Sequence, residues 1–252
     1  MKVAIITGAS AGLGKEFFYE IANKHDEIDE IWLVARRRDR MEKLAAEFRD
    51  KKVEIFSLDL FDTSSFDKFS KILNEREADV RMLINNAGVG KLGNIADEPY
   101  TTQIGMIDLN CRALSAMCSV TLPYMKKGSF ILNVCSIAGF APTPRMTVYS
   151  STKAYVLSYS KSLREELKGK GINVLAVCPG PMNTEFLEVA DIKGNSKTFK
   201  TLPYCDPSQV ARVSLVKADK GRAVWTPRAF YKFYRVLSKI VPHNIIMKMS
   251  KT

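Results

Sequence analysis

Tyr149 and Lys153 are four residues apart, and Ser136 lies thirteen residues before Tyr149. On a helix, side chains at positions i and i+4 share one face, so this spacing can bring an ammonium group against a phenol. The phenol of tyrosine ordinarily has a pKa of about 10, and a nearby positive charge favours its ionised form. The pair therefore predicts a tyrosine that donates or accepts a proton near neutral pH.

A glycine-rich run near the start of the sequence could bind a nucleotide. Thr7-Gly8-Ala9-Ser10-Ala11-Gly12-Leu13-Gly14 follows an apolar run and precedes a helix-like one. Gly8 permits a tight turn, while Gly12 and Gly14 let the backbone approach a pyrophosphate at the start of the helix. The glycine spacing differs from the commoner Gly-x-Gly-x-x-Gly, and a purely structural turn is the alternative interpretation.

Two arginines follow the second apolar run, where a dinucleotide-binding protein places the residue that contacts the adenosine ribose. Arg36 lies twenty-two residues after Gly14, and Arg37 follows it. An acid here would bind the 2′-hydroxyl of NAD, whereas an arginine suits the 2′-phosphate of NADP. A solvated charge run is the simpler interpretation of Arg38 and Arg40. We predict NADP(H) as the preferred cofactor, with NAD(H) as the alternative.

These residues belong to an alternation of short apolar runs with longer amphipathic ones. The apolar runs are mostly continuous, which is typical of parallel strands covered by helices on both faces. The alternation predicts a single α/β domain with a doubly wound sheet of about seven parallel strands. The predicted strands are residues 3–7, 31–36, 53–58, 82–85, 130–135, 173–178 and 223–225. The predicted helices are residues 13–24, 39–50, 63–77, 102–126, 150–169 and 207–219.

The composition is that of an ordinary globular protein. The chain has 252 residues, of which 46% are hydrophobic and 26% are charged. No apolar run approaches the roughly 18 residues that a membrane-spanning helix needs. The glycine-rich run begins too early for a signal peptide to precede it. We therefore expect a cytoplasmic protein with no transmembrane helix.

Cysteine and histidine are too sparse and scattered for a metal centre. The five cysteines form no Cys-x-x-Cys pair, and their odd number and scatter suit buried thiols in a reducing compartment. The two histidines, His25 and His243, lie far from any cluster of candidate ligands. We predict no metal site and no histidine-based catalytic triad.

The positive charge of the chain is concentrated near its C-terminus. Residues 193–252 contain thirteen Lys and Arg but only two acids, Asp206 and Asp219, and this excess equals the net charge of +11. Within this segment, lysines and arginines alternate with an apolar stripe at helical spacing, which predicts a basic amphipathic helix. The stripe consists of Phe230, Phe233, Tyr234, Leu237, Ile240 and Val241.

Three roles for this C-terminal helix stay open. Its apolar stripe could pack on the domain, or it could contact a membrane while the basic residues face anionic lipid. The charge could also attract substrates that bear phosphate, sulfate or carboxylate. No motif for nucleic-acid binding accompanies the charge, so we predict no nucleic-acid partner.

Six motifs occur together in the order and spacing of one enzyme family. They are Thr7-Gly8-x-x-x-Gly12-x-Gly14, Asn85-Asn86-Ala87-Gly88, Asn110, Ser136, Tyr149-x-x-x-Lys153 and Pro179-Gly180-x-x-x-Thr184. By these motifs, residues 1–190 resemble the short-chain dehydrogenases/reductases. The resemblance implies a Rossmann fold and a nicotinamide-dependent oxidoreductase that acts on an alcohol or a ketone.

The resemblance also implies a catalytic set of four residues. Tyr149 would be the general acid or base, and Ser136 would hydrogen-bond the substrate oxygen. Lys153 would lower the pKa of the tyrosine and hold the nicotinamide ribose, while Asn110 would anchor a water that passes protons to solvent. Taken singly, Asn110 could instead be a structural residue that kinks a helix, and Ser136 a turn residue.

A larger set is implied for the cofactor. Asp59 and Leu60 would line the adenine pocket. Ala11 occupies a position that is basic in some NADP-binding relatives, so phosphate selectivity would rest on Arg36 and Arg37 alone. The full implied set is Gly8, Ser10, Gly12, Leu13, Gly14, Arg36, Arg37, Asp59, Leu60, Asn86, Ala87, Gly88, Tyr149, Lys153, Pro179, Gly180, Met182 and Thr184.

We predict an NADP(H)-dependent enzyme that interconverts a ketone and a secondary alcohol. The catalytic domain would be residues 1–227, with a substrate lid at 185–205 and a basic extension at 228–252. Apolar residues in the lid favour a lipophilic substrate of the steroid or 3-oxoacyl type, and relatives suggest a homodimer or homotetramer. The alternative is a catalytically silent nucleotide sensor or scaffold on the same fold.

Overall fold

The protein is built around one parallel sheet of seven strands. We obtained a computed structural model that describes residues 1–249, and its strands run in the order β3-β2-β1-β4-β5-β6-β7. Every pairing of neighbouring strands is parallel, as predicted. The strands are β1 (Lys2–Thr7), β2 (Glu30–Ala35), β3 (Lys52–Ser57), β4 (Asp79–Asn85), β5 (Met125–Val134), β6 (Asn173–Val177) and β7 (Val224–Trp225).

Strand β1 shows why its run of residues is apolar throughout. Val3 and Ile5 belong to the hydrophobic core on one face of the sheet, while Ala4 and Ile6 belong to the core on the other. All four side chains are fully buried. Successive side chains of a strand point to opposite faces, so a strand covered on both faces must be apolar at every position.

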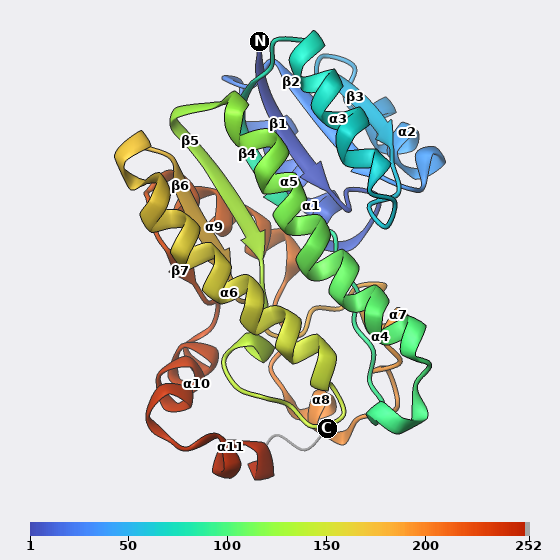
Figure 1. Ribbon diagram of the computed structural model, residues 1–252, viewed down its shortest axis with the longest axis vertical. Coiled ribbons are helices and arrows are strands. Elements are labelled where there is room, and N and C mark those ends of the chain that lie inside the picture. The colour runs from blue at the N-terminus through green and yellow to red at the C-terminus, as the bar shows by residue number, and fades with distance from the viewer. Residues whose placement is uncertain (250–252) are drawn as a thin grey trace.

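Helices cover both faces of the sheet, which confirms the predicted doubly wound Rossmann fold (Figure 1). Helices α3, α5 and α6 pack on the core that contains Val3, whereas α1, α2 and α9 pack on the core that contains Ala4. The helices are α1 (Gly12–Lys24), α2 (Arg38–Ala46), α3 (Ser64–Glu75), α4 (Tyr100–Ile107), α5 (Leu114–Thr121), α6 (Thr147–Leu167), α7 (Phe186–Val189), α8 (Lys197–Thr201), α9 (Pro207–Asp219), α10 (Ala229–Ile240) and α11 (His243–Met249).

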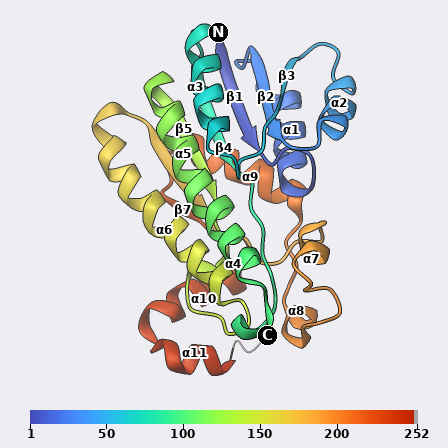
Figure 2. The same ribbon diagram turned by 45° about the vertical axis from the view of Figure 1, so that its right-hand side comes forward.

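The carboxyl ends of the strands meet at one edge of the sheet. The strand arrows in Figures 1 and 2 point toward the end of the molecule where α7, α8, α10 and α11 lie. From β1 the chain adds β2 and β3 on one side and then returns to add β4 to β7 on the other. The strand order therefore reverses between β1 and β4, and such a switch point opens a crevice for a ligand.

The long helix predicted at 102–126 is broken in the structure. It consists of α4, a π-helical segment at Asp108–Ala113, α5 and a short 3₁₀ turn at Leu122–Tyr124. A π-helical turn widens the hydrogen-bonded ring and re-aims the side chains within it, and such turns are frequent at functional sites. The predicted end of this helix was wrong, because Met125 is buried and already pairs with Val80 as the first residue of β5.

The C-terminal helix α10 presents apolar residues on two sides, not on the single face that the sequence predicted. Tyr231 is fully buried in the core that contains Ala4, and Tyr234 packs on Phe140 with ring centroids 6.2 Å apart. Phe233 and Ile240 instead point outward and are 66% and 75% exposed. Like every other helix among residues 1–249, α10 is too short or too polar to cross a membrane.

The predicted boundary between a catalytic domain at 1–227 and an extension at 228–252 stays a proposal. Tyr231 lies beyond residue 227 but packs in the core of the domain. Residues 250–252 of the basic segment lie outside the described part of the chain.

The ring of Tyr231 fills the space beside Gly180, so a side chain at this glycine should destabilise the fold. A Cβ atom on Gly180 would lie 2.2 Å from Cε2 of Tyr231. The tyrosine is buried and its hydroxyl donates a hydrogen bond of 2.8 Å to the carbonyl oxygen of Pro203, so the ring has no room to move. We expect Gly180→Ala to lower the free energy of unfolding by about 1–3 kcal/mol in urea denaturation.

Gly169→Ala is the matched control for this variant. No atom lies within 4 Å of a Cβ built on Gly169. We expect its free energy of unfolding to stay within about 0.5 kcal/mol of the wild-type value. Equal stability of the two variants would contradict the packing argument.

Candidate active site

A large cavity lies at the carboxyl edge of the sheet, where the strand order reverses. Its volume is about 580 Å³. The walls come from the glycine-rich loop, the loops after β2 to β6, the lid segment and α10. Every residue predicted to be catalytic or cofactor-binding lines this cavity, except Gly14 and Asn110, which lie behind its wall.

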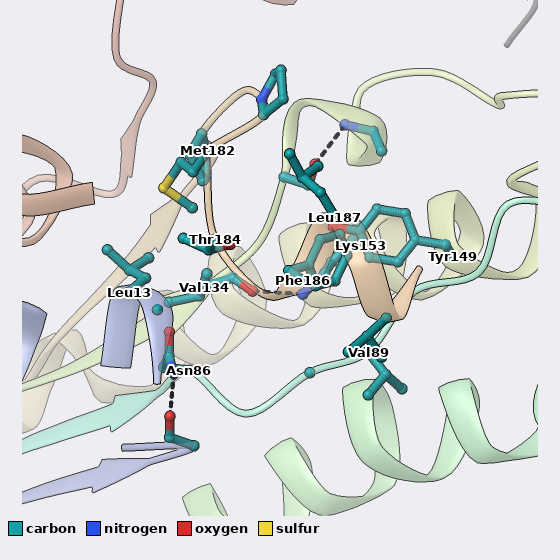
Figure 3. A pocket seen from close by; sticks show the side chains of 18 of the residues that line it. Leu13, Asn86, Val89, Val134, Tyr149, Lys153, Met182, Thr184, Phe186 and Leu187 are labelled. Atoms are coloured by element: carbon teal, nitrogen blue, oxygen red, sulfur yellow. Dashed lines mark hydrogen bonds between the residues drawn. The ribbon is translucent and has the colours of Figure 1, made fainter. Parts of the chain in front are cut away.

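Helix α6 carries Tyr149 in its first turn and Lys153 in its second, as predicted. The Nζ atom of Lys153 lies over the tyrosine ring, 5.7 Å from its centroid, and donates a hydrogen bond of 2.9 Å to the carbonyl oxygen of Val134 (Figure 3). Ser136 begins the short 3₁₀ turn after β5, and its Oγ atom accepts a hydrogen bond of 3.1 Å from the amide of Ala138. The three side chains therefore meet at one wall of the cavity.

Burial shifts the pKa of Tyr149 and that of Lys153 in opposite directions. The two side chains are 8% and 5% exposed, and loss of water disfavours the charged form of each. Burial therefore raises the pKa of the Tyr149 phenol, an effect that the neighbouring Ser136 hydroxyl opposes. Burial also lowers the pKa of Lys153.

The pKa of Tyr149 is thus raised, whereas the sequence predicted that Lys153 would lower it. The physical reason is that desolvation of the buried phenol outweighs every interaction that would stabilise its anion.

Asn110 lies in the π-helical segment and binds a neighbouring loop. Its Oδ1 accepts a hydrogen bond of 2.9 Å from the amide of Val89, and its Nδ2 donates one of 2.8 Å to the carbonyl oxygen of the same residue. Nδ2 also donates to Oγ1 of Thr152, which in turn donates to the carbonyl oxygen of Tyr149 at 2.7 Å. Asn110 thus ties the loop after β4 to the helix turn that carries the tyrosine. No sequence motif had marked Thr152.

The glycine-rich loop has the shape that a nucleotide needs. Gly8 and Gly12 adopt positive φ angles of 66° and 53°, which side chains disfavour. A Cβ on Gly14 would lie 2.3 Å from the carbonyl oxygen of Gly8, so only glycine allows α1 to start here. The side chain of Asn86 holds the loop, because its Nδ2 donates to the carbonyl oxygens of Thr7 and Gly8 at 3.1 and 3.2 Å. The backbone is therefore open to a pyrophosphate at the start of α1.

The arginines after β2 have different partners. The guanidinium of Arg36 lies 5.7 Å from the centroid of the Phe61 ring. Arg37 donates from Nε and Nη2 to Oγ of Ser10 in the glycine-rich loop. It also donates from Nη1 to Glu185 at 3.0 Å. Both arginines line the cavity, as the prediction of a phosphate site requires.

The side chains of Arg38 and Arg40 both reach solvent, as a solvated charge run implies, but Arg40 also has a distant partner that the sequence did not predict. Arg38 forms a surface ion pair with Glu42, one turn further along α2. Arg40 binds the carboxylate of Glu185 at 2.5 Å, although Glu185 lies 145 residues further along the chain. Sequence reasoning missed Glu185 because nothing in a local motif signals a contact at that distance.

The segment predicted as a lid, residues 185–205, lines the cavity beside the tyrosine. The ring of Phe186 packs on that of Tyr149 with centroids 5.6 Å apart, and Figure 3 shows the two side by side. Leu187 is buried in a small apolar cluster that also contains Tyr149. The apolar residues of this segment that line the cavity include Phe186, Leu187, Val189, Phe199 and Leu202.

The cysteines behave as predicted, because all five are free and buried. Burial raises the pKa of Cys111 to about 11 and that of Cys118 to about 12. Across residues 1–249, no cluster of three or more His, Cys, Asp or Glu side chains could hold a metal ion.

Comparison with known proteins assigns the family. The family model for short chain dehydrogenases matches residues 2–193. The chain therefore belongs to the short-chain dehydrogenase/reductase family, as its motifs indicated. An uncharacterized oxidoreductase of Staphylococcus epidermidis is 30% identical over 198 residues, which are 78% of this chain and 84% of that protein.

Two solved structures place the chain among nicotinamide-dependent enzymes. A short-chain dehydrogenase from Sphingobium yanoikuyae in complex with NADPH has a TM-score of 0.82 at 28% identity, and the match covers 98% of this chain and 96% of that one. A 3-ketoacyl-(acyl-carrier-protein) reductase from Brucella melitensis complexed with NADH has a TM-score of 0.77 at 25% identity, covering 90% and 96%. The protein is an NAD(P)-dependent dehydrogenase or reductase.

The raised pKa of Tyr149 predicts different pH profiles for the two directions of reaction. Ketone reduction needs the protonated phenol, which a raised pKa preserves to higher pH, so its rate should stay flat from about pH 6 to pH 9. Alcohol oxidation needs the phenolate, whose fraction grows about tenfold per pH unit below the pKa, so its rate should keep rising over this range.

The measurement is kcat in each direction across this range, with circular dichroism to show that the protein stays folded. A reduction rate that falls with a midpoint near neutral pH would show that the tyrosine has a lowered pKa instead.

Proposed function

We propose that the protein is an NADPH-dependent carbonyl reductase that interconverts a lipophilic ketone and a secondary alcohol, with Tyr149 as the general acid and base. One observation carries the proposal. Tyr149, Ser136 and Lys153 meet in a cavity that joins the glycine-rich loop on one side to an apolar lid on the other. A hydride donor bound along the loop would thus end beside the tyrosine.

Each residue of the site has a distinct task in this proposal. The nicotinamide, when bound, supplies the hydride. Tyr149 donates the proton to the substrate oxygen, and burial keeps its phenol in the protonated form that this step consumes. The Ala138 amide occupies a lone pair of the Ser136 hydroxyl, which leaves the hydroxyl proton to bind the same oxygen.

Lys153 and Asn110 support these two residues. Lys153 reaches past Gly88, where a Cβ would lie 3.5 Å from its Nζ, and so stands where it can donate to the nicotinamide ribose. Asn110 holds the loop and helix through Val89 and Thr152, and we assign to it the water that returns protons to the tyrosine.

The apolar wall of the cavity supports a lipophilic substrate. Phe186, Phe199 and Leu202 enter it from the lid, while Tyr234 and Leu237 enter it from α10. A steroid or a 3-oxoacyl chain would remove the apolar surface of these side chains from water. The Brucella reductase of similar structure is named for a 3-ketoacyl substrate.

Preference for NADP(H) is supported by the two arginines on the cavity wall. Arg36 makes no ion pair among the described residues and lies beside Phe61, so its guanidinium is available to a 2′-phosphate. The flat guanidinium suits phosphate oxygens better than a neutral 2′-hydroxyl does. NAD(H) remains the alternative cofactor.

Replacement of the tyrosine tests the reaction assigned to it. Tyr149→Phe keeps the ring that packs on Phe186 but removes the proton donor. We expect ketone-dependent NADPH oxidation to fall by about 10²- to 10⁴-fold, while NADPH affinity in a fluorescence titration changes little. A silent nucleotide sensor would show no ketone-dependent oxidation even as wild type. A wild-type rate in the variant would overturn the assignment of the tyrosine.

Self-association and a cytoplasmic location are further parts of the proposal. Tyr100, Ile104 and Ile107 on α4 are 74%, 49% and 48% exposed, and Tyr155 on the neighbouring α6 is 43% exposed. Exposed apolar side chains on adjoining helices are typical of a subunit contact, which supports a dimer or tetramer through this face.

We also propose peripheral contact with an anionic membrane through residues 228–252. Phe233, Val236 and Ile240 form an outward ridge on α10, and each is more than half exposed. Lys232 and Lys239 are exposed on the same helix. An apolar ridge beside lysines fits the boundary between acyl chains and negatively charged headgroups. Pairing two copies through this face would instead bring like charges together.

Removal of the ridge tests membrane contact without disturbing the core. Deletion of 228–252 would remove Tyr231 from the core, so we choose Phe233→Gln with Ile240→Gln. Wild type should co-sediment with phosphatidylglycerol vesicles and lose binding in high salt. The double variant should bind at least about tenfold more weakly.

Val216→Gln is the control, because it changes a 46% exposed apolar residue on α9. We expect it to bind vesicles like wild type. The membrane proposal fails if wild type does not bind or if the ridge variant binds equally well.

A further inference from the structure

Glu185 joins the lid to the arginines after β2 by two ion pairs. It directly precedes α7. Its Oε2 accepts a hydrogen bond of 3.0 Å from Nη1 of Arg37, and its Oε1 accepts one of 2.5 Å from Nη1 of Arg40. The two guanidinium groups lower the pKa of this carboxyl, which is therefore ionised at neutral pH. The carboxylate of Glu185 therefore already binds the two arginines, Arg37 and Arg40, as an anion of the protein itself.

Three of the five N–H donors of Arg37 bind protein groups. Nε and Nη2 donate to Oγ of Ser10 at 3.2 and 3.0 Å, and Nη1 donates to Glu185. A 2′-phosphate that binds Nη1 and Nη2 of Arg37 would lie beside the Glu185 carboxylate, which already binds Nη1. The cavity is lined by Ser10, Arg37 and Glu185 together, so a bound phosphate and the carboxylate would compete for the same guanidinium.

Glu185 is also connected to the catalytic end of the cavity. The next residue, Phe186, packs on the ring of Tyr149, and Leu187 is buried in the same apolar cluster. The amides of Leu187 and Glu188 donate to the carbonyl oxygens of Thr184 and Glu185, which makes the segment one tight turn. The Glu185 carboxylate therefore belongs to the same turn as the two side chains that pack beside the tyrosine.

We propose that Glu185 is a competitor for the 2′-phosphate of NADP(H), which displaces it from Arg37 and thereby repositions the lid. The proposal rests on the proposed preference for this cofactor. The carboxylate is about half exposed, and ion pairs at such sites are weak. A phosphate carries about twice the charge of a carboxylate and has more acceptor oxygens, so it binds Arg37 in place of Glu185. NAD(H) has a neutral 2′-hydroxyl and leaves the ion pairs intact.

Neutralising the carboxylate tests the competition. Glu185→Gln keeps the size of the side chain but removes its charge. We expect the Kd for NADPH, measured by fluorescence titration, to fall by about two- to fivefold, while the Kd for NADH stays unchanged. Glu188→Gln is the matched control, because this exposed lid residue pairs with Lys193 and not with the arginines. Its affinity for both cofactors should match wild type.

A second measurement tests the coupling to the lid. Hydrogen exchange of residues 185–205 should be faster with NADPH than with NADH in wild type, because the phosphate breaks the ion pair of Glu185 with Arg37. The difference should disappear in Glu185→Gln. Equal effects of this variant on both cofactors, or weaker NADPH binding, would show that Glu185 only supports the lid and would overturn the proposal.

Arg36→Ala separates this result from the proposed function. If NADP preference is right, this variant weakens NADPH much more than NADH. Equal losses with the two cofactors would reject the preference itself. A normal Arg36→Ala result together with unchanged affinities in Glu185→Gln would reject the competition alone.

Discussion

Lys153 carries an ammonium group into a part of the protein that is almost closed to solvent. The group is stabilised there by the carbonyl oxygen of Val134, the last residue of β5. A buried charge without such a partner would be costly, so α6 and β5 must approach closely. The 3₁₀ turn that follows β5 can lie close to α6 because Gly139 has no side chain, since a Cβ there would lie 2.6 Å from the carbonyl oxygen of Lys153. Gly88 leaves room in the same way on the other side of the ammonium.

The burial that the lysine requires also sets the state of the tyrosine. Both side chains project from adjacent turns of α6 into the same poorly solvated region. Burial there raises the pKa of the phenol, which favours its protonated form, and lowers the pKa of the ammonium. Asn110 and Thr152 then hold the start of α6 against the loop after β4. The π-helical segment that aims Asn110 at this loop is part of the same arrangement.

Two segments that come late in the chain line the cavity. Glu185 binds the arginines after β2, and Tyr231 on α10 fills the space beside Gly180. The inner side of α10 packs on the core and lines the cavity, so its remaining apolar residues, including Phe233, face outward. The charge of the C-terminal segment is thus joined to an exposed apolar ridge, a combination that a helix packed only on its own domain would not need.

The sequence alone determined the seven strands, and nearly all the residues that it predicted for the site line one cavity. Its motifs lie at strand ends and at the start of α6, where local rules of alternation, glycine geometry and i, i+4 spacing decide the position of each side chain. Only the tertiary structure decided the pKa direction of Tyr149, the partners of Arg37 and Arg40, and which residues of α10 face outward. These properties depend on desolvation and on contacts between residues far apart in the chain, such as Arg37 and Glu185, which no local pattern encodes.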